Sequence, residues 1–145
     1  MTAITDLQAA TLRAQLAGHM DEHLRLLDQL DGPARAGYRT LVSAAFFEAA
    51  RQRFPEGTSP ADVIEYVGDI RSRLEGAADS IDPRIAERLI LAVFTDEQID
   101  DIDAVTNFRT QLLLLGALIA GENPGEARLD QFLARARKLA DQWLS

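Results

Sequence analysis

The sequence predicts an all-α fold: a single domain of about six helices over residues 1–145. Two observations support this fold class. The chain contains 23 alanines, which are strong helix formers, and its few β-branched residues do not alternate with polar residues as they would in strands. Three segments also place a capping residue before a proline and an apolar-periodic run, which is typical of a helix start. These segments are Ser59-Pro60, Asp82-Pro83 and Asn123-Pro124.

The first expected helix covers residues 5–30. Its apolar residues recur every three or four positions, which predicts one buried face. Gly32 and Pro33 then end the helix, because glycine suits the C-terminal turn and proline cannot continue it. The predicted buried face consists of Leu12, Leu16, Met20, His23, Leu27 and Leu30.

The second expected helix, 33–54, is apolar on nearly all sides, with Glu48 as the one charged residue between positions 40 and 50. Glu48 is either a partly buried carboxylate, and so a functional candidate, or is paired with a neighbouring arginine, which by sequence proximity would be Arg51. A helix of this kind lies at the centre of a bundle, or has one face in the core and another against a partner. One predicted face contains Tyr38, Leu41, Val42, Ala45 and Ala49, the opposite face contains Phe47 and Phe54, and Phe46 lies between them.

Residues 60–75 form the clearest amphipathic helix, which we expect to end at Gly76. A fourth helix is expected over 83–94. Thr95 and Gln98 then have the spacing of a capping box, which indicates a further helical turn before 104. The inward residues of the helix over 60–75 are Val63, Val67, Ile70 and Leu74, with Tyr66 at the margin.

The fifth expected helix covers 104–120, with Leu112 to Ile119 apolar on all sides. The sixth covers 124–144, with Asn123 as its cap and Pro124 at its first position. Its predicted inward residues are Leu129, Phe132, Leu133, Ala136, Ala140 and Trp143.

The composition excludes several classes of function. The net charge of −8 and the isoelectric point near 4.7 argue against a nucleic acid or an anionic membrane surface as the partner. The chain has no cysteine, so it has no disulfides or thiolate sites. It has no secretory leader pattern, and its longest near-apolar run, 112–120, is shorter than the ~20 residues that span a bilayer. We therefore expect a cytoplasmic protein that uses no cofactor.

One motif could carry chemistry. His19, Glu22 and His23 match the H-x-x-E-H pattern of a metalloprotease family, in which two histidines hold zinc and the glutamate acts as base. A catalytic zinc also needs a third protein ligand, for which Glu97 or Asp100 are the candidates. The alternative is that both histidines lie at the boundary of the core. A metal-dependent hydrolase is therefore the weakest of three hypotheses.

The leading hypothesis is a non-enzymatic interaction protein that acts through apolar helix faces. Its predicted interface consists of Phe46, Phe47 and Phe54, and its partner is another protein or a second copy, most simply in a two-fold homodimer. The alternative is a helical domain with an apolar pocket for a small ligand. That pocket would be lined by Phe46, Phe47, Tyr66 and Leu112 to Leu115.

Overall fold

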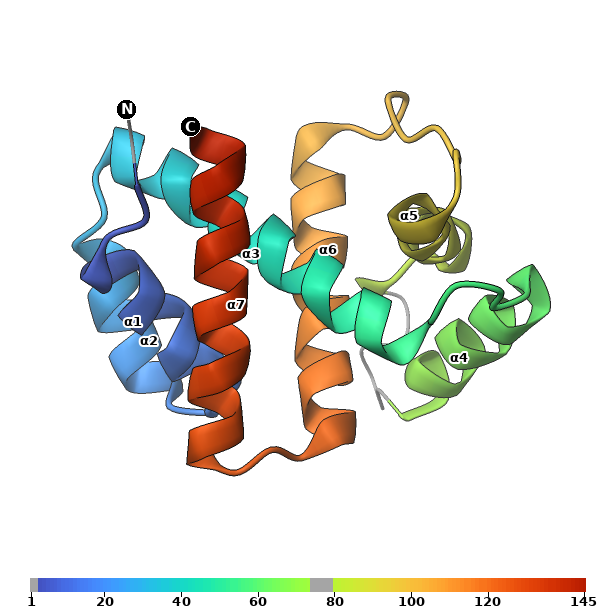
Figure 1. Cartoon of the computed structure of the whole chain (residues 1–145), viewed down its shortest axis with the longest axis horizontal. Coiled ribbons are helices and arrows are strands. Elements are labelled where there is room, and N and C mark those ends of the chain that lie inside the picture. The colour runs from blue at the N-terminus through green and yellow to red at the C-terminus, as the bar shows by residue number, and fades with distance from the viewer. Residues whose placement is uncertain (1–2, 74–79) are drawn as a thin grey trace. The chain divides into compact units, whose positions relative to one another are not determined.

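A computed structural model of the chain describes residues 3–73 and 80–145. These residues form seven α-helices and no strand, which confirms the predicted all-α class (Figure 1). The chain divides into a first unit, Met1–Glu48 with Ile119–Ser145, and a second unit, Ala49–Leu118. The single domain expected from the sequence stays a prediction. The helices are α1 (Asp6–Leu16), α2 (Met20–Asp28), α3 (Gly32–Arg53), α4 (Pro60–Arg73), α5 (Pro83–Phe94), α6 (Ala104–Glu122) and α7 (Glu126–Leu144).

The prediction of a single helix over 5–30 is wrong, because this part of the chain forms two helices, α1 and α2. Gly18 has a φ of +83°, a backbone conformation that glycine adopts at little cost. Its N–H donates to the Gln15 carbonyl at 3.1 Å, and the N–H of His19 donates to the Ala14 carbonyl at 2.8 Å. These two bonds form a Schellman motif, which ends α1 and lets α2 turn back along it.

This break changes which residues of α2 are buried. His23 and Leu26 are buried, whereas Met20 and Leu24 are exposed. Met20 was predicted to lie inward only because the apolar period was continued through Gly18. The Nδ1 atom of His23 lies 2.8 Å from the Thr11 carbonyl oxygen, so His23 is a polar link between α2 and α1.

The predicted helix 33–54 is confirmed within one residue at each end by α3. Its residues Leu41, Val42 and Ala45 are buried. The expected pairing of Glu48 with Arg51 is replaced by a contact with Arg135 of α7, at 4.0 Å. This partner lies far away along the chain, so sequence proximity could not identify it.

The start of α1 packs closely against α3. Thr5 and Gln8 form a capping box, and Gln8 Nε2 also donates to the Ala34 carbonyl at 2.7 Å. A Cβ atom added at Gly37 would lie 2.5 Å from that nitrogen. Gly37 is therefore the position on α3 that leaves room for the buried Gln8 amide.

Two glycine substitutions are expected to have opposite effects. At Gly68, in the exposed part of α4, an added Cβ meets nothing within 4 Å, so Gly68→Ala should raise the free energy of unfolding by about 0.5–1 kcal/mol. Gly37→Ala should lower it by about 1 kcal/mol, since displacing the Gln8 amide costs more than the helix gains. Urea denaturation measures both, and equal stabilisation by the two variants would show that Gln8 is not held in place.

In the second unit, α4 and α5 begin as the sequence predicts. Ser59 Oγ accepts the N–H of Asp62 at 3.2 Å, and Asp82 accepts the N–H of Arg84 at 2.9 Å. Val63, Val67 and Ile70 of α4 are buried as expected. The predicted inward Leu74 and the stop at Gly76 lie outside the described residues.

No helix begins at Thr95, and the predicted capping box there is wrong. Thr95 instead ends α5, because its N–H and its hydroxyl both donate to the Leu91 carbonyl, at 2.8 and 2.6 Å. Between Thr95 and residue 120 the chain therefore forms one helix, α6, which begins at Ala104. Asp103 caps it by accepting the N–H of Thr106 at 3.0 Å.

The residues before α6 are tied to α5 by an ion pair between Arg88 and Asp101, 2.6 Å apart. The hydrogen bond from Arg88 lowers the pKa of the Asp101 carboxyl below its usual value. Because this pKa is lower in the folded than in the unfolded chain, the pair stabilises the fold above the unfolded pKa. That contribution is lost as the pH falls through the folded pKa. In a carbon-detected NMR titration, we expect the Asp101 midpoint to return toward the ordinary aspartate value in Arg88→Gln.

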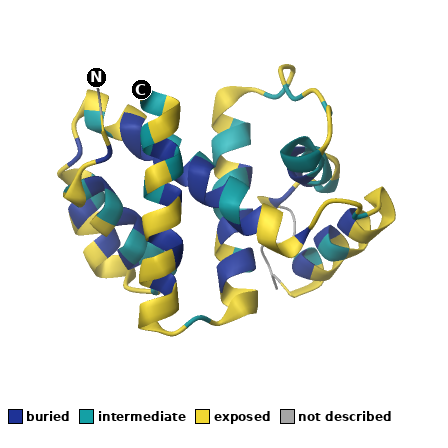
Figure 2. Ribbon diagram, in the orientation of Figure 1, coloured by how far each residue is buried: buried dark blue, intermediate teal, exposed yellow. Residues whose placement is uncertain are grey.

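Asn123 has a different role from the predicted one. It has a φ of +45° and its N–H donates to the Ile119 carbonyl at 3.0 Å, so it closes α6 instead of capping α7. Gly125 is the N-cap of α7, which begins at Glu126. Five predicted inward residues of α7 are buried, and Trp143 is not. Buried and exposed positions follow one another along α7 in Figure 2. The buried residues are Leu129, Phe132, Leu133, Ala136 and Ala140.

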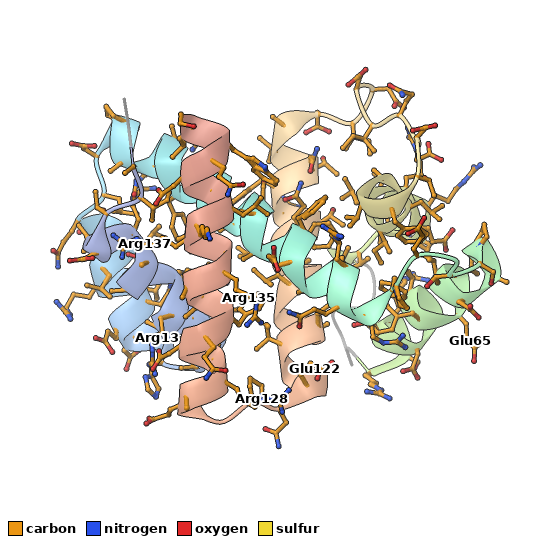
Figure 3. All side chains as sticks on the ribbon, viewed as in Figure 1. Arg13, Glu65, Glu122, Arg128, Arg135 and Arg137 are labelled. Atoms are coloured by element: carbon orange, nitrogen blue, oxygen red, sulfur yellow. The ribbon has the colours of Figure 1, made fainter. Side chains whose placement is uncertain are left out.

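The N-terminal segment is fastened to α7 by two of its side chains, one helical turn apart. Asp141 accepts the N–H of Ile4 at 2.7 Å. Arg137 donates to the Ile4 carbonyl at 2.7 Å and to Asp6 at 2.9 Å, and it points from α7 toward α1 (Figure 3). Both backbone groups of the buried Ile4 are therefore satisfied by α7.

Candidate functional site

The most notable surface feature of the first unit is an aromatic pair formed by Phe47 of α3 and Trp143 of α7. The two rings meet edge to face, with centroids 5.9 Å apart and planes at 79°. Phe47 is half-buried, whereas 47% of Trp143 is exposed. An indole of this size in water gives up much of the stabilisation that burial would supply. We call these two residues the aromatic pair.

The helices explain why the pair is at the surface. Trp143 lies seven residues after Ala136, so it projects from the same face of α7 as the buried residues. It lies in the last turn of the helix, beyond Ala140, the last buried residue of α7. Phe47 is held by its position in the long helix α3, where its neighbours Phe46 and Ala45 are buried.

A charged contact lies next to Phe47 along the chain. Glu48 follows Phe47 in the chain and contacts Arg135, whose side chain is half exposed. Arg135 projects from α7 on the side away from Arg137 (Figure 3). An apolar centre with charged groups at its edge is the usual arrangement of a protein–protein interface.

The three phenylalanines of the predicted interface differ in exposure. Phe46 is 4% exposed and Phe54 is 1% exposed, so both side chains are within the core of the chain. Phe54 packs edge to face on Tyr66 at 5.0 Å, and Arg53 lies over both rings. Of the three, only Phe47 retains side-chain surface.

The predicted ligand-pocket residues belong to both units. Phe46 and Phe47 are in the first unit, whereas Tyr66, Leu112 and Leu115 are in the second. Tyr66 lines an open hollow of about 670 Å³ in the second unit, whose other lining residues are mostly polar or charged. They are Arg53, Pro55, Thr58, Asp62, Glu65 and Asp69. Apart from Tyr66 and Pro55, an apolar ligand therefore meets only polar or charged side chains in this hollow.

The two histidines of the candidate metal motif have different surroundings. His23 is buried and its Nδ1 atom donates to the Thr11 carbonyl, which accepts only, so this nitrogen carries the proton. His19 is exposed at the start of α2, and Glu22 contacts Arg25 at 3.7 Å. Over residues 3–73 and 80–145, no three or more acidic or histidine side chains are grouped to hold a metal ion. This arrangement gives the hydrolase hypothesis no support.

His19 instead lines an open hollow of about 270 Å³ in the first unit, together with Arg13, Glu126 and the α6–α7 turn. Arg13 is engaged by Asp130 of α7 at 2.7 Å, and this hydrogen bond raises the pKa of Arg13 above its usual value. The hollow thus lies beside a structural ion pair. None of its described lining residues has a buried polar side-chain atom without a hydrogen-bond partner.

Helix α6 is the most apolar long helix that the structure describes. Its 19 residues have a mean hydropathy of 1.2 over the best 18-residue window, and 28% of that window is buried. Length and composition alone would allow it to cross a membrane. A core helix of a water-soluble protein has the same two properties, so they do not assign α6 to a membrane.

Sequence reasoning missed Trp143 as a site residue because it extended the buried face of α7 to the end of the helix. No sequence signal separates Trp143 from the buried residues, because the apolar period of α7 continues through it. The aromatic pair is the arrangement with which the structure supports a binding surface. No known protein family, curated protein or solved structure matches this chain.

Proposed function

We propose that this chain is a non-enzymatic interaction protein that self-associates through the aromatic pair, with a two-fold homodimer as its simplest form. The observation that supports it is the exposure of Trp143 beside the half-buried Phe47. Tryptophan dominates the energetics of many interfaces because a ring buried there removes a large apolar area from water. Binding of a different protein at the same surface is the alternative.

The charged contact next to Phe47 supports the same proposal. Glu48 and Arg135 can be moved from water to the edge of an interface without losing their contact with each other. A net charge of −8 on each copy opposes association in general, so the copies should meet where the surface is apolar and locally balanced in charge.

The chain contains one tryptophan, so its intrinsic fluorescence reports directly on the proposed interface. We expect the Trp143 emission to shift to shorter wavelength, and its quenching by acrylamide to fall, as the protein concentration rises from nanomolar to high micromolar. Light scattering on the same samples should show a change from monomer to dimer over the same range.

The test variant is Phe47→Glu, which places a charge in the pair and leaves Trp143 in place. We expect a folded monomer whose tryptophan emission no longer depends on concentration. The matched control is Leu24→Glu, because Leu24 is an exposed leucine of α2 in the same unit. The control should still form the dimer.

Two results would contradict the proposal. A wild-type chain that stays monomeric at high micromolar concentration would exclude self-association. A Phe47→Glu chain that has lost its helical circular dichroism would show that Phe47 is a core residue. Trp143→Ala then distinguishes an interface role of the aromatic pair from a core role. Truncating an exposed indole should leave the fold intact while removing an interface residue.

A further inference from the structure

The segment 95–103, between α5 and α6, is held by a single side chain. Arg88 of α5 donates from Nε to Glu97 at 3.3 Å and from two nitrogens to Asp101 at 2.6 and 3.0 Å. Its Nη2 atom also donates to the carbonyl oxygen of Gln98. One guanidinium therefore binds Glu97, Gln98 and Asp101, and its contact with the Asp101 carboxylate is the bidentate type that is typical of arginine.

Little else in this segment resists opening. Within 96–102, all of which is described, the one backbone-to-backbone hydrogen bond joins the N–H of Ile102 to the Ile99 carbonyl at 3.0 Å. Both isoleucine side chains are only half-buried. The segment's other recorded bonds are local, such as the N–H of Glu97 donating to Thr95 Oγ1 at 3.2 Å.

The charge of the segment also favours opening. Five carboxylates lie between positions 96 and 103, and they repel one another when Arg88 does not neutralise them. The far end of the segment is held at Asp103, which accepts the N–H of Thr106 at 3.0 Å. That bond lowers the pKa of the Asp103 carboxyl below its usual value, and the charge of Arg109 adds to the effect. The carboxylates are Asp96, Glu97, Asp100, Asp101 and Asp103.

We propose that residues 96–102, between ends held at Thr95 and Asp103, form a strap that opens and closes as one local unit while α4 and α5 keep their fold, with Arg88 as its latch. Segments with few buried apolar contacts and few backbone bonds are the ones that open with the least free energy. When open, the strap is a mobile acidic segment attached to the start of α6. This inference concerns the second unit and does not depend on the aromatic pair of the first.

Hydrogen exchange of the full chain, followed by NMR or mass spectrometry, tests the proposal. In Arg88→Gln we expect the amides of Glu97 and Ile102 to exchange about threefold faster or more, which is the scale of one exposed ion pair. Exchange in α4 should be unchanged. Arg88→Lys keeps the charge but loses the fork, and should give an intermediate rate.

The matched control is Arg84→Gln, one helical turn earlier on α5, which should leave the strap unchanged. The double variant Glu97→Gln with Asp101→Asn removes the two negative charges that Arg88 binds and leaves only neutral acceptors. It should accelerate exchange at the same amides as Arg88→Gln, which gives a second test if Arg88→Gln folds poorly. If exchange at Glu97 and Ile102 is unchanged in these variants, Arg88 does not keep the strap closed and the proposal is wrong. If amide exchange is accelerated equally in α4 and in the strap, the strap does not open as a separate local unit, because Arg88 would then support the whole fold.

Discussion

Phe54→Ala is expected to lower the free energy of unfolding by about 3–5 kcal/mol, the usual cost of deleting a fully buried phenylalanine. Phe54 is among the largest completely buried side chains, and its ring packs against Tyr66 with centroids 5.0 Å apart. The substitution removes the ring's burial, leaves a cavity and ends the edge-to-face contact. Urea denaturation followed by circular dichroism measures the loss.

The control for Phe54→Ala is Phe47→Ala, since Phe47 lies in α3 and Phe54 directly follows that helix. Because Phe47 is only half-buried, the smaller area removed from water should cost about half as much or less. If both variants lose the same stability, Phe47 is a core residue like Phe54, and the aromatic pair would then have no surface to offer a partner. The comparison therefore bears on function as well as on stability.

Leu12→Ala is expected to destabilise the chain by about 2–5 kcal/mol, whereas Met20→Ala should change the free energy of unfolding by less than about 0.5 kcal/mol. Both residues belong to the same apolar stripe of the sequence. Leu12 is completely buried in α1, but Met20 lies beyond Gly18 and is exposed. Equal losses in the two variants, measured by thermal and urea unfolding, would mean that the helix continues through Gly18 in solution.

The helix starts that could be predicted are those decided by local chemistry. Ser59 and Asp82 each bond to backbone N–H groups in the first turn of the helix that follows, and the proline after each of them occupies the first helical position. Asn123 could not be assigned in this way, because asparagine is favoured both as an N-cap and in the left-handed conformation that ends a helix. The structure has it in the second role.

The break at Gly18 was hidden for a related reason. A single glycine inside a periodic apolar run is compatible with a continuous helix, and the decision depends on whether the two halves gain more by packing on each other. Here His23 bonds to Thr11 and Leu26 is buried, so the paired α1 and α2 are favoured. Such a gain comes from tertiary contacts and has no local signature.

The candidate site was predictable in part. Apolar character on several sides of α3 correctly drew attention to its phenylalanines, but residue type alone could not separate the buried Phe46 and Phe54 from the half-exposed Phe47. The partner ring, Trp143, lies 96 positions away in the chain. Side-chain contacts between residues so far apart depend on how the helices pack, and the apolar periodicity of the sequence carries no information about that packing.

The bonds from Asp141 and Arg137 to Ile4 have a consequence for the order of folding. They close the first unit across a separation of 137 residues, whereas all of the second unit lies in one continuous stretch, Ala49–Leu118. Contacts between distant residues form slowly, because a long loop must lose its entropy before they contribute. We therefore expect the second unit to be protected first in pulse-labelled refolding, and the N-terminal segment to be fastened as the final step.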